Sequence, residues 1–345
     1  MTKSLTNRRA LLRGAMLAPL AAPAFIGKAI AAGAVTWRVQ SHWPKASGSF
    51  NDSLGVLAAE LEKRSEGAFK LELFGAGEFG KGKDIYQLIK RGVLPMGTCS
   101  PSYFQDEVEA ASFGYGIPGT FRESWQLQHA IKNLGIEDLM NEQMNPTGVL
   151  YMTEKVYPTE LVVSKKIETA ADFAGLKLRS SGTMLDYLAA AGAAPQYIAG
   201  AELYQSISSG VVDGAHWGAA IGAKSMSLWE VAKYHVKPPL GLTGDGFIVN
   251  IKELEKLDDD MQLLLTSLLE ERFWRRSAEY LHKEAIALAA GRAENGVEVI
   301  NLPEEVSQML VAASSDILAK EAARGPLAEK AAAAYSGLMR DLGYL

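Results

Sequence analysis

The residues that could do chemistry begin with an arginine at the end of a predicted strand. Leu176-Lys177-Leu178-Arg179 alternates apolar and basic residues, which is typical of a strand. The planar guanidinium of Arg179 could grip a carboxylate with two hydrogen bonds, and a strand end would hold it rigidly. The spacing also allows a second interpretation, in which Lys177 and Arg179 share a strand face that is exposed to solvent.

Aromatic and imidazole side chains follow other predicted strands. His216-Trp217 ends the stretch that begins at Val211, and strand ends in an open α/β sheet face the ligand crevice, where an indole can form a wall. Trp217 could equally belong to the core, and His216 could donate to an anion or bond to a backbone carbonyl. Trp43 and Tyr103 each follow a predicted strand and could close the crevice from the other side.

One glycine motif suggests a nucleotide site. Gly75-Ala76-Gly77-Glu78-Phe79-Gly80 has the spacing G-x-G-x-x-G after a predicted strand, as dinucleotide-binding loops do. Glu78 would put a carboxylate where a pyrophosphate should lie, and the next helix is predicted to begin only near Lys83. A glycine-rich turn at the mouth of a cleft is therefore favoured over a cofactor loop.

Signatures of catalysis are lacking. The five histidines show no H-x-x-x-H pairing, and no G-x-S-x-G occurs, so neither a common zinc motif nor a nucleophile elbow is indicated. The single cysteine, Cys99, falls in a predicted core strand and can form neither an intramolecular disulfide nor a cysteine cluster. These motifs therefore give no support to a hydrolase or a metalloenzyme, although a catalytic triad can still be assembled in space from distant residues.

Composition narrows the class further. The chain has 345 residues, of which 48% are hydrophobic, and a formal net charge of −5. This length suffices for two domains or one large α/β domain with an ample core. The acidic balance argues against a nucleic-acid-coating protein.

Residues 1–31 are predicted to be an export signal. They hold basic residues and no acid, followed by a short apolar stretch and Ala29-Ile30-Ala31, the layout of a cleavable signal. The pair Arg8-Arg9 is similar to the twin-arginine signal of the Tat pathway. A membrane anchor is the alternative, but the apolar stretch is too short to span a bilayer easily. The expected location is the periplasm.

The elements that must position these residues alternate between strands and helices. The βα rhythm favours a mainly parallel sheet. A helical run from about Asp258 to Glu294 would reach roughly 55 Å, longer than one lobe needs, so we expect it to brace two lobes. The main predicted strands are residues 36–40, 69–74, 96–99, 148–152, 161–163, 176–179, 196–198, 211–212, 247–250 and 297–300, and the main helices are 53–64, 83–90, 124–141, 184–190 and 201–208.

Three segments together resemble one family, the DctP-type solute-binding proteins of TRAP transporters. The stretch from Ala201 to Gly214 (AELYQSISSGVVDG) resembles its E-x-Y-x-A/S-L-x-x-G-x-V-D-G signature. Residues 172–179 (DFAGLKLR) resemble its D-L-x-G-L-K-x-R segment, and residues 74–80 resemble its glycine loop. The correspondence runs in consistent order from about Trp37 to Gly296.

The resemblance implies a two-lobed α/β fold of the periplasmic-binding-protein type, with crossing strands and a long helix that spans both lobes. Lobe I would comprise residues 35–155 and about 245–280. Lobe II would comprise residues 156–244 and about 281–345. The oligomeric state is left open between a monomer and a homodimer.

The resemblance also implies a function and a site. The protein would capture a small organic acid anion, a 2-oxo or 2-hydroxy acid, and deliver it to the membrane subunits of a TRAP permease. Arg179 would pair with the ligand carboxylate, and the remaining contacts would come from Trp217, His216, Tyr103, Trp43 and Asp245. The resemblance thus implies a receptor that is not an enzyme and has no cofactor. The alternatives are an ABC-type solute receptor and an exported enzyme that acts on an organic acid.

The resemblance bears on metal binding as well. The branch for 2-oxo and 2-hydroxy acids commonly has a Glu-Trp pair that helps to hold a cation, whereas this chain has His216-Trp217. An imidazole in place of a carboxylate weakens a site for a hard cation. We therefore expect no metal, and the only place where one could be held would be at Trp217 and Asp245.

Overall fold

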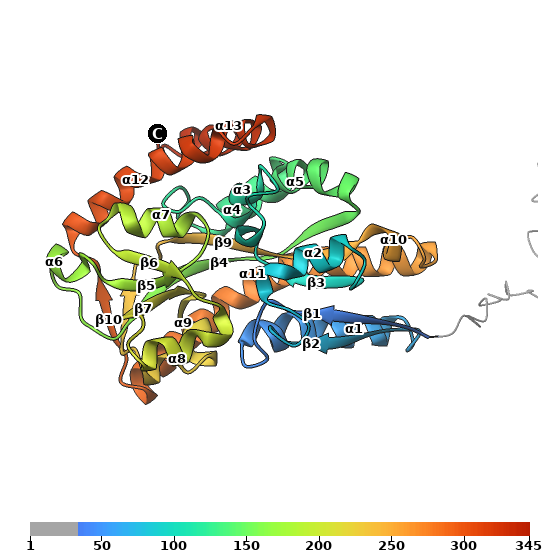
Figure 1. The fold of residues 1–345 in the computed structure, drawn as a ribbon, viewed down its shortest axis with the longest axis horizontal. Coiled ribbons are helices and arrows are strands. Elements are labelled where there is room, and N and C mark those ends of the chain that lie inside the picture. Colours follow the sequence, from blue (N-terminus) through green and yellow to red (C-terminus); the bar gives the residue numbers. More distant parts are fainter. Residues whose placement is uncertain (1–33) are drawn as a thin grey trace, which may run out of the picture. The chain divides into compact units, whose positions relative to one another are not determined.

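The strands of the protein form a ten-stranded mixed sheet in the computed structural model, which describes residues 34–345 as one compact unit (Figure 1). The main strand order is β2-β1-β3-β9-β4-β7-β5-β6, and β8 pairs with both β4 and β10. The strands are β1 (Val35–Gln40), β2 (Phe69–Phe74), β3 (Met96–Cys99), β4 (Val149–Val163), β5 (Lys177–Ser180), β6 (Ala194–Tyr197), β7 (Gly214–Trp217), β8 (Tyr234–Lys237), β9 (Gly241–Asn250) and β10 (Glu298–Asn301).

Two long antiparallel strands join two groups of parallel strands. β9 pairs with β3 on one side and with residues 149–159 of β4 on the other, whereas residues 160–163 of β4 pair with β7. β1, β2 and β3 are parallel to each other, and so are β5, β6 and β7. The sheet is therefore mixed, and the expectation of a mainly parallel sheet was wrong at its centre.

β4 corrects another prediction. Two separate strands, 148–152 and 161–163, were expected, but one continuous strand covers both, with a register shift between Thr153 and Lys155. The intervening charges of Glu154 and Lys155 hid the strand, because charged residues are normally exposed. Here both are buried.

The helices are α1 (Val56–Arg64), α2 (Ile85–Lys90), α3 (Ala111–Tyr115), α4 (Ser124–Asn133), α5 (Ile136–Met144), α6 (Ala170–Phe173), α7 (Thr183–Ala190), α8 (Leu203–Ser208), α9 (Ala219–Ser225), α10 (Ile251–Leu254), α11 (Asp259–Glu294), α12 (Glu304–Ala322) and α13 (Pro326–Asp341). The expected helix 124–141 is broken into α4 and α5 at Gly135, whose φ of 79° lies in the left-handed region that favours glycine. Within residues 34–345, no helix has the length and apolar character needed to cross a bilayer.

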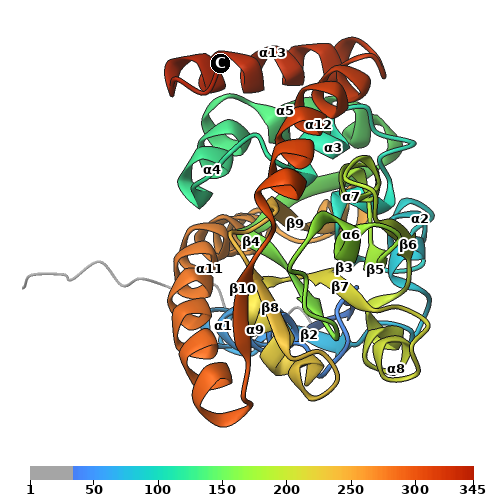
Figure 2. The same cartoon turned by 90° about the vertical axis from the view of Figure 1, so that its left-hand side faces the viewer.

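The long helix α11 confirms the predicted run over 258–294. The carboxylate of Asp258 accepts a hydrogen bond of 2.8 Å from the backbone N–H of Met261, which caps the first turn. The helix packs against β4, α9 and α1 (Figure 2). It therefore contacts one helix that follows β1, namely α1, and one that follows β7, namely α9, as well as the strand β4 that joins the two groups.

Packing at the C-terminus bears on the predicted lobes. α13 packs on α3, α4 and α5, and α12 packs on α7, so the tail that we assigned to lobe II also contacts helices of lobe I. The lobe boundaries stay a prediction. The predicted signal, residues 1–31, lies outside the described residues.

Candidate functional site

A pocket of about 60 Å³ lies where the carboxyl ends of four strands converge. β1, β3, β5 and β7 end at residues 40, 99, 180 and 217, and residues just after each end line the pocket. β4, β9 and α11 contribute Tyr157, Asp245 and Tyr280 to the lining. The lining comprises His42, Trp43, Ser47, Gly48, Ser49, Ser100, Tyr103, Tyr115, Tyr157, Arg179, Ser181, His216, Trp217, Gly218, Ile221, Gly222, Ser225, Asp245 and Tyr280. All six residues predicted from the sequence, Arg179, Trp217, His216, Tyr103, Trp43 and Asp245, are among them.

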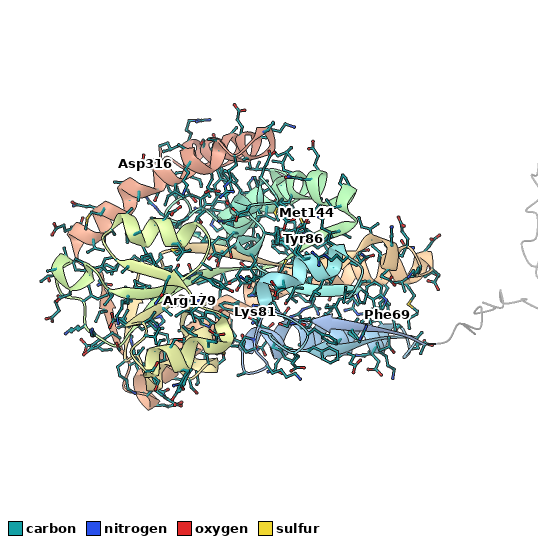
Figure 3. All side chains as sticks on the ribbon, viewed as in Figure 1. Phe69, Lys81, Tyr86, Met144, Arg179 and Asp316 are labelled. Atoms are coloured by element: carbon teal, nitrogen blue, oxygen red, sulfur yellow. The ribbon has the colours of Figure 1, made fainter. Side chains whose placement is uncertain are left out.

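Arg179 lies on β5 (Figure 3) and is only 3% exposed. The interpretation as a solvated strand face was therefore wrong for Arg179. Its Nε donates to the carbonyl of Ile198 at 2.9 Å and its Nη1 to the carbonyl of His216 at 3.0 Å. Within residues 34–345, no carboxylate lies within ion-pair distance of this guanidinium, and Nη2 has no hydrogen-bond acceptor.

A buried guanidinium without a carboxylate partner is unfavourable unless something else supplies the negative charge. The two backbone hydrogen bonds fix the direction of the remaining donor. The Trp217 ring lies 4.8 Å from the guanidinium carbon, so the cation stacks on the indole. Trp217 is half-buried and forms a wall of the pocket, rather than part of a closed core.

His216 is buried, and within residues 34–345 its ring nitrogens lie near two hydroxyl groups and not near a backbone carbonyl; donation to an anion stays a prediction. Its Nδ1 lies 3.0 Å from the hydroxyl of Ser180, and its Nε2 lies 3.4 Å from the hydroxyl of Tyr115. Burial, together with the positive charge of Arg179, lowers the pKa of His216 to about 3. The imidazole is therefore neutral at neutral pH, and it links β5 to α3 rather than presenting a charge.

Asp245 is the only carboxylate among the residues that line the pocket. Lys155 donates to its Oδ2 at 2.8 Å and the Trp43 indole donates to the same oxygen at 3.3 Å. His42 Nε2 lies 3.5 Å from Oδ1. Burial by itself would raise the pKa of Asp245, but attraction to Lys155 and His42 outweighs burial and holds it well below its usual range.

Several tyrosines complete the lining and stay protonated. Burial raises the pKa of Tyr115 to about 12 and also raises that of Tyr103. Tyr280 on α11 donates to the carbonyl of Gly218. These phenols offer hydroxyl groups to a polar ligand, whereas their rings make the walls apolar.

A hard metal ion does not fit these residues. Such ions need several oxygen ligands, but Asp245 offers one carboxylate whose Oδ2 already accepts from Lys155 and Trp43. Both ring nitrogens of His216 already have partners. These donors make a poor site for a hard cation, and the expectation that no metal is held at Trp217 and Asp245 stays a prediction.

A second cluster lies outside the pocket. Glu160, His235 and Glu284 are buried close enough together to suggest a metal site. However, Lys237 contacts Glu160 and lies 3.7 Å from Glu284, and Glu160 also contacts His235. The ammonium supplies the positive charge, so the cluster is explained as a buried salt bridge that joins β4, β8 and α11.

The glycine motif at 75–80 is a turn and does not line the pocket. Gln40 holds it, through its amide nitrogen to Gly80 and its amide oxygen to the backbone N–H of Phe79. Glu78 forms an ion pair with Lys45. The interpretation as a turn is confirmed, and its expected place at the mouth of a cleft stays a prediction.

Sequence reasoning missed the pocket residues His42, Tyr115, Tyr157 and Tyr280, and it also missed Lys155 behind them. His42 directly precedes Trp43, so the same strand-end argument could have found it. Lys155 and Tyr157 lie in the part of β4 that was not predicted. Tyr280 lies on the long helix, where no local signal distinguishes it.

Comparison with known proteins places this geometry in context. The sequence profile of the family described as bacterial extracellular solute-binding protein, family 7 (DctP), matches residues 40–324. A monocarboxylate 2-oxoacid-binding periplasmic protein of Nostoc sp. is 24% identical over 310 residues, covering 84% of this chain and 80% of that protein.

Two solved structures share the fold. A TRAP transporter solute-binding protein from Bordetella bronchiseptica, with copurified calcium and picolinate, has a TM-score of 0.82 at 21% identity and covers 90% of this chain and 94% of its own. A TRAP periplasmic solute-binding protein from Pseudoalteromonas atlantica, with bound sodium and pyruvate, has a TM-score of 0.80 at 22% identity, with coverages of 90% and 95%.

Proposed function

This chain belongs to bacterial extracellular solute-binding protein family 7, and we propose that it is a periplasmic receptor for a small organic acid, a 2-oxo or 2-hydroxy acid. It hands the acid to the membrane subunits of a TRAP permease. Residues 1–31 direct export through the Tat pathway. The family match leaves the alternative of an ABC-type receptor without support.

The observation that carries this proposal is the state of Arg179. It is buried in the pocket, two of its nitrogens are fixed by backbone carbonyls, and Nη2 is left for an outside acceptor. A ligand carboxylate would supply the negative charge that the described residues do not. The similarity to a 2-oxoacid-binding protein supports the same chemistry.

The pocket is small. Its volume of about 60 Å³ leaves room for only a few water-sized groups. This favours an acid with a short carbon chain over a sugar acid or a long dicarboxylate.

Capture proceeds by closure of the two lobes. Arg179 takes the carboxylate, and Trp43 and Tyr103 shut over it from the other lobe. The ring of Tyr103 already lies 6.0 Å from that of Tyr197 at the end of β6. The ligand favours the closed state because it touches both sides only there.

Thermal denaturation against a panel of acids tests this function. The panel comprises pyruvate, lactate, 2-oxobutyrate, picolinate, pyroglutamate, succinate and gluconate, each with EDTA and with calcium chloride. A ligand at 100 times its Kd adds about 2.7 kcal/mol to the free energy of unfolding, a rise of roughly 4 °C for a chain of this length. Flat curves for every acid would refute the receptor function.

The same mixtures are analysed for new products after incubation. A receptor returns the acid unchanged, whereas the alternative of an exported enzyme requires a product that increases with time.

A further inference from the structure

We propose that Lys155 is a built-in cation that positions Asp245 and lets the pocket bind its acid without a metal ion. The proposal rests on the proposed function, because it concerns how the same pocket accepts an anion. Lys155 touches neither the solvent nor the pocket surface, so it acts through Asp245 and is a positioning residue.

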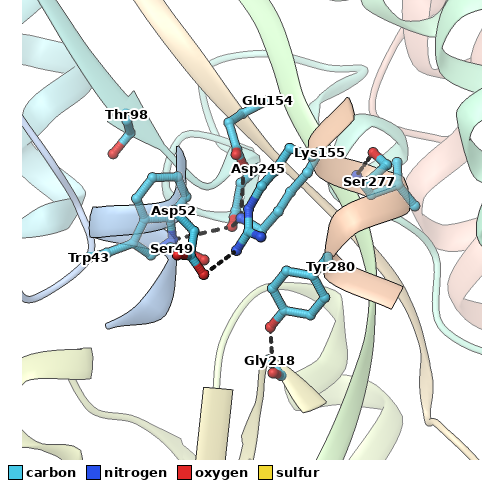
Figure 4. Close-up of polar contacts among 12 residues, drawn as sticks. Trp43, Ser49, Asp52, Thr98, Glu154, Lys155, Gly218, Asp245, Ser277 and Tyr280 are labelled. Atoms are coloured by element: carbon cyan, nitrogen blue, oxygen red, sulfur yellow. Dashed lines mark hydrogen bonds and ion pairs between the residues drawn. The ribbon is translucent and has the colours of Figure 1, made fainter. Parts of the chain in front are cut away.

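The ammonium of Lys155 is buried among two carboxylates and three aromatic rings. Its Nζ lies 2.8 Å from Asp245 Oδ2 and 2.8 Å from Glu154 Oε2, and the side chain is 1% exposed. Figure 4 shows the ammonium between the two carboxylates. The rings of Trp43, Tyr157 and Tyr280 lie 4.3, 4.5 and 5.8 Å from Nζ.

Those three rings belong to three different elements and also line the pocket. Trp43 follows β1, Tyr157 is on β4 and Tyr280 is on α11. Each ring therefore presents one face or edge to the ammonium while it forms part of the ligand's surroundings. Lys155 thus connects the groups that shape the pocket, in addition to its pairing with Asp245.

The charge of Asp245 explains why such a cation is needed. A buried carboxylate in the wall of a pocket repels an anionic ligand, and it is itself unstable there without a partner. Arg179 is not that partner, because no carboxylate of the described residues lies within ion-pair distance of it. Lys155 offsets the charge of Asp245 from behind while it also pairs with Glu154, and Arg179 keeps its positive charge for the ligand.

A metal ion could neutralise Asp245 in the same way, but Lys155 already pairs with Oδ2 of Asp245. Hard cations gather several oxygen atoms, whereas Asp245 Oδ2 is already shared by the ammonium and the Trp43 indole. The aromatic faces around Nζ attract an ammonium and offer no lone pairs to a metal. The four-carbon arm of Lys155 makes this cation a permanent part of the fold.

The decisive measurement asks whether the wild-type protein needs a metal ion to bind the acid. Calcium chloride and sodium chloride are each titrated alone into the EDTA-treated wild-type protein by calorimetry, and we expect no saturable binding in the pocket. The rise in melting temperature with the acid panel should be the same in EDTA as in calcium or sodium. Two results would overturn the proposal. One is calcium or sodium binding in the micromolar range that disappears in Asp245→Asn, and the other is a rise in melting temperature with the acid that requires the metal.

Variants then test Lys155 itself. Lys155→Met keeps the length of the side chain and removes the charge, and it should weaken binding of the acid in EDTA about tenfold or more. Lys155→Arg keeps the charge and should retain most of the affinity. Wild-type affinity in Lys155→Met, measured in EDTA, would refute the role.

Lys132 provides a matched control. It is also mostly buried between two carboxylates, with Nζ 2.7 Å from Glu137 and 2.6 Å from Glu270, and it lies 4.8 Å from the Phe273 ring. It is not part of the pocket lining. Lys132→Met should lower the melting temperature and leave the affinity for the acid unchanged, which separates loss of stability from loss of positioning.

The outcomes distinguish this proposal from the proposed function. If no acid raises the melting temperature of the wild-type protein under any condition, the proposed function fails. The metal titrations then still decide whether Lys155 replaces a metal. If acids bind only with calcium or sodium, the receptor function stands and the role of Lys155 fails. Should Lys155→Met not fold, the wild-type metal dependence decides alone.

Discussion

The guanidinium carbon of Arg179 lies 4.8 Å from the centre of the Trp217 ring, so the cation of the pocket rests on the indole that walls it. The two residues come from neighbouring parallel strands, β5 and β7. Nη1 of Arg179 also donates to the carbonyl of His216, one residue before Trp217. The strand pairing, the stacking and the hydrogen bond together fix where a carboxylate can meet Nη2.

The first prediction concerns Arg179. Arg179→Ala removes the proposed partner of the carboxylate and should weaken binding of the acid by about 3 kcal/mol or more, roughly a hundredfold. Arg179→Lys keeps a charge but loses the planar fork, and it should recover only part of this loss. Isothermal titration calorimetry measures both affinities.

Lys177 is the control for that prediction. It lies two residues earlier on the same strand, is exposed, and donates to the carbonyl of Gly210. Lys177→Ala should bind the acid as the wild type does. Equal losses in the two alanine variants would mean a general effect of positive charge instead of a contact at Arg179.

The second prediction concerns pH and His216. The pKa of His216 in the folded protein is about 3, whereas an unfolded histidine has a pKa of about 6.5. The unfolded state therefore binds the proton first as the pH falls, so stability from this group is complete above about pH 6.5 and is lost as the pH falls toward 3. Between these limits the loss is about 1.4 kcal/mol for each pH unit.

Urea denaturation at several pH values measures this effect. His216→Gln removes the titration, so the difference in free energy of unfolding between wild type and variant should shrink as the pH falls from 7 to 4. His282→Gln, which replaces an exposed histidine on α11, controls for the loss of any histidine. A difference that stays constant with pH would show that His216 is not buried in its neutral form.

β4 shows how much of the fold could be predicted from the sequence. Pattern reasoning found the ends of this strand, the long helix α11 and the strands that Trp43 and Tyr103 follow. It was wrong in placing a strand at 211–212, because β7 covers Gly214–Trp217. It failed at Glu154 and Lys155, because two adjacent charges normally indicate a surface. Here they are buried, because Lys155 pairs with its neighbour Glu154 on β4 and with Asp245 on β9. Asp245 is 90 residues away in the sequence, and no local pattern reveals such a pairing.

At the site, the sequence could predict which residues line the pocket but not which groups they pair with. The sequence, with the family resemblance, identified six residues that line one pocket, because strand ends of parallel strands converge at one edge. It could not assign the partners of these residues. That Asp245 is neutralised while Arg179 is not depends on side-chain directions in the folded chain, and so does the pairing of His216 with Ser180 and Tyr115.

The third prediction concerns the glycines that clamp the indole. A Cβ on Gly222 would lie 2.8 Å from Trp217 Cδ1, and a Cβ on Gly200 would lie 2.6 Å from its Cη2. Gly222→Ala must therefore displace the ring that supports Arg179, and overpacking of this kind costs about 1–3 kcal/mol. We expect a lower melting temperature and affinity for the acid reduced about tenfold.

Gly337 on α13 is the matched control, because a Cβ there meets nothing within 4 Å. Gly337→Ala should stabilise the protein by about 0.5–1 kcal/mol, through the better helix propensity of alanine, and leave the affinity unchanged. If Gly222→Ala also stabilises the protein and binds normally, the indole is not clamped as the structure shows.

The last prediction concerns closure. The rings of Tyr103 and Tyr197 are edge to face, with centroids 6.0 Å apart, and they come from the loop after β3 and from β6. Such aromatic pairs contribute about 0.5–1.5 kcal/mol. Tyr197 is not part of the pocket lining, so Tyr197→Ala should speed release of the acid about two- to tenfold and change the association rate little.

Stopped-flow measurement of tryptophan fluorescence separates the two rates, because Trp43 and Trp217 both line the pocket. Tyr204→Ala, on α8, removes a tyrosine whose hydroxyl donates to Glu230 and should leave release unchanged. The double variant Tyr103→Ala with Tyr197→Ala should release the acid more slowly than the two single effects multiplied together would require, since the pair can be broken only once. Strictly multiplicative effects would show that the two rings do not act together in holding the pocket closed.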